Sequence, residues 1–112
     1  MDLAIEQLGD VGIVVVPLAE LDASNTSEFK RDMTAFIDAH PRLVLDLTGV
    51  RFIDSSGLGA LLSCLRKLKE KGGDLKLFGM SAAVRGVFEL VRMQRVFDIY
   101  PTRAEAVRAF AP

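Results

Sequence analysis

Residues 42–73 read RLVLDLTGVRFIDSSGLGALLSCLRKLKEKGG, which places a strand, a polar turn and a helix in succession. The segment Arg42–Leu47 is apolar on both faces for most of its length, as expected for a central strand that is covered by helices. Five leucines between Leu58 and Leu68 then recur at helical spacing, and Gly72-Gly73 ends this stripe. A buried strand followed by an amphipathic helix indicates an α/β fold.

The residues near the start of the chain predict a β-hairpin. Apolar positions between Leu3 and Leu8 are followed by the turn Gly9-Asp10 and by the β-branched run Val11–Leu18. Two strands joined so closely are expected to pair in antiparallel fashion. Pro17 indicates either a sheet edge or the end of the second strand.

A helix is expected between this hairpin and His40-Pro41. Its apolar side chains fall on one stripe, formed by Phe29, Met33, Phe36 and Ile37. Asn25 and Glu28 have the spacing of a capping box, and Ser24 and Thr26 are alternative caps.

The residues after Gly73 predict two more strands, Asp74–Gly79 and Val96–Tyr100, each followed by a helix. Ser81 is expected to cap the first of these helices, and Thr102 with Glu105 forms a capping box for the second. The inward side chains of the first helix are expected to be Val84, Val87, Phe88 and Val91. The predicted fold is α/β, a mixed β-sheet of four to five strands with four helices, in the order ββαβαβαβα or close to it.

The composition of the chain argues against several classes of function. The chain has 112 residues, and 14 Lys and Arg against 15 Asp and Glu give a net charge of -1. This balance offers no electrostatic basis for binding nucleic acid or an anionic membrane. No apolar run reaches the length of a membrane span, and the lone Cys64 fits a reducing cytosol. A single cysteine and a single histidine, far apart, argue against a zinc site.

The segment Arg51–Gly59, at the carboxyl end of the central strand, has the most specialised composition. Ligands and modifications gather at such strand ends in α/β sheets. The first N–H groups of a helix lack an internal acceptor, so a dianion on Ser55 or Ser56 would meet free donors and the positive end of the helix dipole. The same residues also fit an ordinary helix start, in which Asp54 or either serine is the cap. In that interpretation Gly57 and Gly59 only let the helix approach the sheet closely, although each costs about 1 kcal/mol inside a helix.

The run Asp54-Ser55-Ser56-Gly57-Leu58-Gly59 resembles the signature of the STAS domain, and more narrowly that of bacterial anti-sigma factor antagonists. Three other segments resemble the family in the same order along the chain, namely Glu20-Leu21-Asp22, Leu43–Leu47 and Ser81–Val84 with Phe88. The resemblance covers nearly the whole chain. It implies a STAS-like fold and a single STAS domain over residues 1–112. Ala19 departs from the family pattern, in which Gly is usual before Glu20.

The resemblance implies a binding function rather than catalysis, with no cofactor and no metal. Members of this family bind an anti-sigma factor that is also a serine kinase, and so free a sigma factor in the bacterial cytoplasm. The kinase phosphorylates the first serine of the motif, here Ser55, which ends binding, and a PP2C-type phosphatase restores it. The partner-binding residues implied by the match are Asp22, Ser24, Asp54, Ser55, Ser56, Gly57 and Leu58.

The sequence also raises three alternative functions. STAS domains also occur as small subunits of phospholipid-transport ABC complexes, where the motif region docks on the transporter ATPase, but the intact motif favours the kinase-regulated branch. An enzyme with Ser55 as nucleophile needs a general base, and the one histidine, His40, lies at a predicted helix end far along the chain. Asp46 invites comparison with the phosphoacceptor of receiver domains, but two successive strands at the start and no lysine after Lys76 argue against it.

Overall fold

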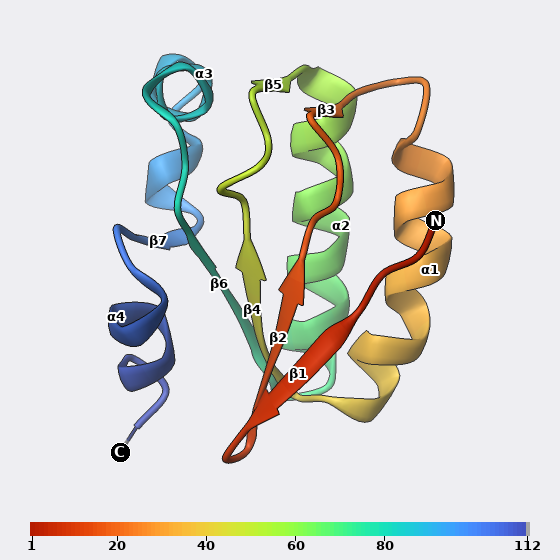
Figure 1. Ribbon diagram of the computed structural model, residues 1–112, viewed down its shortest axis with the longest axis vertical. Helices are drawn as coiled ribbons and strands as arrows, with labels where there is room; N and C mark the ends of the chain where they lie inside the picture. The colour runs from red at the N-terminus through yellow and green to blue at the C-terminus, as the bar shows by residue number, and fades with distance from the viewer. Residues whose placement is uncertain (112) are drawn as a thin grey trace.

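The structure, a computed structural model, describes residues 1–111 and is built around a five-stranded sheet (Figure 1). The order of its strands is β1 (Ile5–Leu8), β2 (Val11–Val15), β4 (Arg42–Asp46), β6 (Asp74–Phe78) and β7 (Asp98–Tyr100). The β1–β2 pair is antiparallel, as predicted for a hairpin, and the other pairs are parallel. The expected mixed sheet is confirmed.

Helices cover both faces of the sheet. The helices α1 (Thr26–Ala39) and α2 (Ser55–Glu70) lie side by side on one face, and α4 (Arg103–Arg108) covers the other (Figure 1). Alternation along β4 explains this arrangement, since Leu43 and Leu45 belong to the larger core under α1 and α2, while Val44 belongs to the smaller core under α4. The double-sided apolar pattern of the central strand was therefore a correct guide to its position.

A second, two-stranded sheet was not predicted. It pairs β3 (Glu20–Leu21) in parallel with β5 (Phe52–Ile53). Each strand has only two residues, too few for a period-two pattern to be visible in the sequence. In Figure 1 this small sheet, the start of α2 and helix α3 (Ala82–Leu90) gather at the end of the molecule to which β2 and β4 point.

The chain between α3 and β7 also differs from the prediction. Arg92 has a left-handed backbone, with φ of 61°, and is followed by the short 3-10 helix η1 (Met93–Arg95), so the last strand begins at Asp98 instead of Val96. Val91 was expected to point inward with Val84 and Phe88, but it follows the end of α3 and is 46% exposed. Pro17 lies beyond the end of β2, which is an inner strand.

Two of the three helix caps predicted for α1, α3 and α4 are confirmed. Ser81 caps α3 by accepting a hydrogen bond from the N–H of Val84, and Thr102 accepts one from Glu105 at the start of α4, both as predicted. The prediction of a capping box formed by Asn25 and Glu28 was wrong. The N–H of Asn25 donates to the carbonyl of Asp22 at 3.1 Å and is unavailable to Glu28.

Candidate functional site

The small β3–β5 sheet positions the two acidic residues of the expected site. Because Leu21 pairs with Ile53 in register, the residues that follow each strand, Asp22 and Asp54, emerge side by side. The N–H of Asp54 donates to the carbonyl of Leu21 at 3.4 Å, and the N–H of Ala23 donates to the Asp54 carboxylate at 3.2 Å. Two loops more than thirty residues apart in sequence are thereby joined beyond the carboxyl ends of the central strands.

Asp54 is the N-cap of α2. Its backbone is extended, and its Oδ1 accepts a hydrogen bond from the N–H of Gly57 at 2.9 Å. The sequence allowed Asp54, Ser55 or Ser56 in this role, and the structure assigns it to Asp54. As a result, neither serine hydroxyl caps the helix.

Ser55 and Ser56 are therefore the first two residues of α2, and both are exposed. Neither hydroxyl forms a hydrogen bond with any residue in the described range 1–111. Their backbone N–H groups belong to the first turn of the helix, where no intrahelical acceptor exists. A modified Ser55 oxygen would therefore meet unsatisfied donors and the positive end of the helix dipole.

Asp22 and Ser24 form a local turn next to this serine pair. One oxygen of Asp22 accepts hydrogen bonds from the Ser24 hydroxyl at 2.5 Å and from its N–H at 2.9 Å. These two hydrogen bonds, of which the one from the hydroxyl has the larger effect, hold the pKa of the Asp22 carboxyl below its ordinary value. The Asn25 amide completes the loop by donating to the Glu20 carbonyl at 2.8 Å. The loop therefore presents a carboxylate that stays ionised at neutral pH.

The two glycines of the motif have different roles. A Cβ on Gly57 would lie 2.2 Å from the carbonyl oxygen of Leu21, so only glycine lets α2 approach β3 this closely. A Cβ on Gly59 would meet no atom within 4 Å. The alternative interpretation, in which close approach explains both glycines, therefore holds for Gly57 and fails for Gly59, which is exposed.

A shallow apolar hollow begins at Ser55. It is lined by Ser55, Leu58, Gly59 and Leu62 of α2 and by Val91 and Met93 from the end of α3 and from η1. Of these residues, the sequence interpretation placed only Ser55 and Leu58 at the site. Leu62 and Val91 were assigned to helix stripes, Met93 was not considered, and no pattern in the sequence links these three residues to the site.

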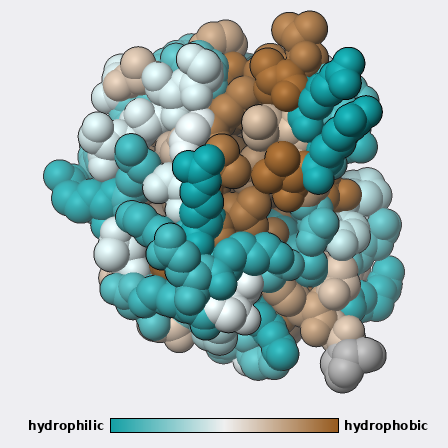
Figure 2. All heavy atoms as spheres, turned by 180° about the vertical axis from the view of Figure 1, so that it is seen from behind, coloured by the Kyte–Doolittle hydropathy of each residue, from teal (hydrophilic) through white to brown (hydrophobic). Residues whose placement is uncertain are grey.

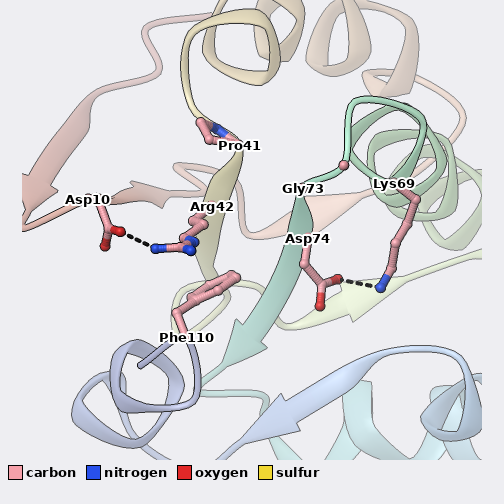
Figure 3. A pocket seen from close by; sticks show the side chains of 8 residues that line it. Asp10, Pro41, Arg42, Lys69, Gly73, Asp74 and Phe110 are labelled. Carbon is pink, nitrogen blue, oxygen red and sulfur yellow. Dashed lines mark hydrogen bonds and ion pairs between the residues drawn. The ribbon is translucent and has the colours of Figure 1, made fainter. Parts of the chain in front are cut away.

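A second hollow lies at the opposite, amino end of the strands, and it differs in character (Figure 3). Its charged side chains are already paired. Arg42 contacts Asp10, and Lys69 lies 3.3 Å from Asp74. With its charges matched inside the protein, this hollow offers less to a charged ligand than the Ser55 end does.

Other residues considered from the sequence have ordinary structural roles. Asp46 accepts hydrogen bonds from the N–H of Thr48 at 2.9 Å and from its hydroxyl, which is a strand-end turn. His40 ends α1 and its Nδ1 lies 3.1 Å from the Phe36 carbonyl oxygen, next to the amino end of β4 and so at the other end of the sheet from Ser55. Cys64 is buried, as expected.

No cluster of three or more histidine, cysteine, aspartate or glutamate side chains suited to a metal ion occurs within residues 1–111. Over the same residues, none of the helices has both the length and the hydrophobicity needed to cross a membrane.

Comparison with known proteins identifies the class to which this arrangement belongs. A family model described as "STAS domain" matches residues 2–106, so the chain belongs to the STAS domain family. An anti-sigma F factor antagonist from Paenibacillus polymyxa is 27% identical over 110 residues, covering 96% of this chain and 94% of the relative. An anti-sigma-B factor antagonist from Listeria monocytogenes is 28% identical over 87 residues, covering 77% and 76%.

Solved structures agree with this assignment. The crystal structure of an anti-sigma factor antagonist from Mycobacterium paratuberculosis superposes with a TM-score of 0.86 at 28% identity, covering 99% of this chain and 94% of that chain. The STAS-like fold expected from the sequence is confirmed, and the chain is similar to curated proteins named anti-sigma factor antagonists.

Proposed function

We propose that this protein is an anti-sigma factor antagonist, a single STAS domain that binds a serine-kinase anti-sigma factor and thereby frees a sigma factor. Its activity is binding, and phosphorylation of Ser55 ends it. A PP2C-type phosphatase acting on phospho-Ser55 restores the binding form. The partner contacts Asp22, Ser24 and the start of α2 from Asp54 to Leu58.

One observation carries the proposal. Asp54 takes the N-cap position, so Ser55 stands exposed with an unbonded hydroxyl at the start of α2. A kinase requires an accessible acceptor, and a serine that capped the helix would have its oxygen occupied by a backbone N–H. The names of the relatives from Paenibacillus polymyxa and Listeria monocytogenes support the same function.

The electrostatics of the site support a switch that leaves the fold intact. Phosphorylation adds about -1.5 to -2 charges beside Asp22 and Asp54. Inside the protein, the free N–H groups and the dipole of α2 offset the repulsion. A docked partner instead meets a bulkier and more negative surface. If this lowers the binding free energy by about 3 kcal/mol, the affinity falls more than a hundredfold.

Phosphorylation by purified kinase tests this function. The chain, its Ser55→Ala variant and its Ser56→Ala variant are each incubated with the anti-sigma kinase and ATP, and modified residues are mapped by mass spectrometry. We expect one phosphate on the wild type and on Ser56→Ala, located at Ser55, and none on Ser55→Ala. Modification of Ser56 instead, or of neither serine, contradicts the proposal.

A further inference from the structure

The apolar hollow beside Ser55 includes Val91, which belongs to a segment with several exposed apolar side chains. Among residues 1–111, six large hydrophobic side chains are strongly exposed, and three of them, Leu90 at 83%, Val91 at 46% and Val96 at 46%, fall within one seven-residue segment. Figure 2 shows the molecule from the side opposite to that of Figure 1. Apolar side chains gather in the upper half of this view, on the side where α3 lies, with hydrophilic side chains along both borders. A concentrated apolar area of this kind marks an interaction surface.

The shape of this area suits protein side chains. The hollow between α2 and the segment 91–93 measures about 280 Å³ and is open to solvent. This is at or below the lower limit of small-molecule pockets, which run from roughly 300 to 1,000 Å³ and are more enclosed. A groove between two helical elements is instead the form that accepts the apolar face of an amphipathic helix.

The charges on its borders define the occupant further. Arg66 follows Leu62 by one helical turn on the same face of α2, and Arg92 and Arg95 flank Met93. All three arginines are exposed, and none takes part in the ion pairs formed by residues 1–111. The basic residues of α2 and of residues 82–96 outnumber the acidic ones, in a chain whose net charge is -1. The part of the border away from Asp22 and Asp54 is therefore complementary to acidic residues.

A second copy of the chain is a poorer occupant. In a two-fold dimer the same surface is used by both subunits, and this surface has an excess of basic residues with few acidic ones to pair with them. Like charges brought together in this way oppose association.

We propose that the groove lined by Leu58, Gly59, Leu62, Val91 and Met93, which we call the α2–η1 groove, binds an amphipathic helix of the anti-sigma factor. The apolar face of that helix fills the groove, and its acidic residues pair with Arg66, Arg92 and Arg95. This inference rests on the proposed function, and it adds the chemistry of the partner. Ser55 lines the same groove, so a phosphate there repels the acidic helix directly.

A pair of peptides tests the groove without knowledge of the partner. Both form amphipathic helices with leucines at positions i, i+3, i+4 and i+7, and their flanking residues are all glutamate in one and all lysine in the other. Titration into the ¹⁵N-labelled chain is followed by NMR. We expect the glutamate peptide to shift the signals of Leu62, Val91 and Met93 and to bind at least about tenfold more tightly than the lysine peptide.

Charge-reversal variants provide the control. Arg66→Glu with Arg92→Glu should remove the preference for the glutamate peptide, whereas Arg108→Glu, an exposed arginine on α4 across the sheet, should keep it. Ser55→Asp should weaken the glutamate peptide only. Equal binding of the two peptides, shifts confined to other surfaces, or binding to phosphatidylglycerol vesicles in place of the peptide each overturns the groove assignment.

The two proposals fail separately. If a kinase modifies Ser55 and this ends partner binding, but Arg66→Glu with Arg92→Glu binds the partner as the wild type does, the groove assignment is wrong and the proposed function stands. If the groove binds the glutamate peptide but no serine-kinase anti-sigma factor modifies Ser55, the proposed function fails and the groove is the surface of another acidic partner.

Discussion

Asp54 accepts a hydrogen bond from the backbone of Ala23, 31 residues earlier in the chain, at 3.2 Å. The other oxygen of the same carboxylate caps α2 through the N–H of Gly57. One side chain therefore fixes both the start of the motif helix and the loop that carries Asp22. The exposed Ser55 therefore follows directly after a residue that is held by two hydrogen bonds.

Removal of this carboxylate should weaken the fold and loosen the loop together. Asp54→Ala is expected to cost about 1 to 2 kcal/mol, the usual loss for an N-cap, measured by chemical denaturation. Asp54→Asn keeps an acceptor oxygen for Gly57 and should cost less. Equal stability of wild type and Asp54→Ala would show that the cap contributes nothing here.

The two motif glycines should respond in opposite directions to the same substitution. Gly57→Ala places a methyl group against the Leu21 carbonyl and is expected to destabilise the protein by roughly 1 to 3 kcal/mol. Gly59→Ala points into open space and should stabilise it by up to about 1 kcal/mol.

Gly86 supplies a matched control for Gly59, because it is also an exposed helical glycine with no atom near its missing Cβ. Gly86→Ala should stabilise the fold as Gly59→Ala does. Only Gly59→Ala should also weaken binding of the glutamate peptide, since Gly59 lines the α2–η1 groove. Destabilisation by both alanines would contradict the open surroundings of these two positions.

Cys64 should be unreactive in the native protein. Burial raises the pKa of its thiol to about 11, so almost no thiolate is present at pH 8. Disulfide-exchange reagents such as DTNB should modify it only after unfolding. Rapid modification of the folded chain would mean that Cys64 is accessible.

The raised pKa of the Cys64 thiol also affects the stability of the protein at alkaline pH. The native state keeps the Cys64 proton to higher pH than the unfolded chain does, so the contribution is complete below pH 9.0 and is lost as the pH rises toward about 11. Cys64→Ala lacks this contribution. The difference in unfolding free energy between wild type and variant should therefore shrink over that range.

Much of the fold could be predicted because its signals are local and periodic. The stripe of Phe29, Met33 and Ile37 and the leucines of α2 mark helices, and the two-sided apolar pattern of β4 marks the centre of the sheet. The motif was also visible in sequence, through its resemblance to a family. The pairing of β3 with β5 then brings the loop of Asp22 next to Asp54, which no local sequence pattern predicted.

The features that were missed depend on contacts between distant segments. The pairing of β3 with β5 involves two residues on each side, and no local pattern encodes it. Val91 has the spacing of an inward helical residue after Val84 and Phe88, but α3 ends at Leu90 and the residue after Val91, Arg92, has a left-handed backbone. Asn25 had the spacing of a cap, but its side chain is held by Glu20 and its N–H by Asp22.

The proposed switch is that one phosphate on Ser55 prevents a partner from docking. It is tested most directly by calorimetric titration of the anti-sigma factor with the chain carrying phosphoserine at position 55, with the unmodified chain and Ser55→Ala as references. We expect the unmodified and alanine forms to bind alike and the phosphorylated form to bind at least about a hundredfold more weakly, with an unchanged melting temperature. Equal affinity of the phosphorylated and unmodified forms would contradict the account.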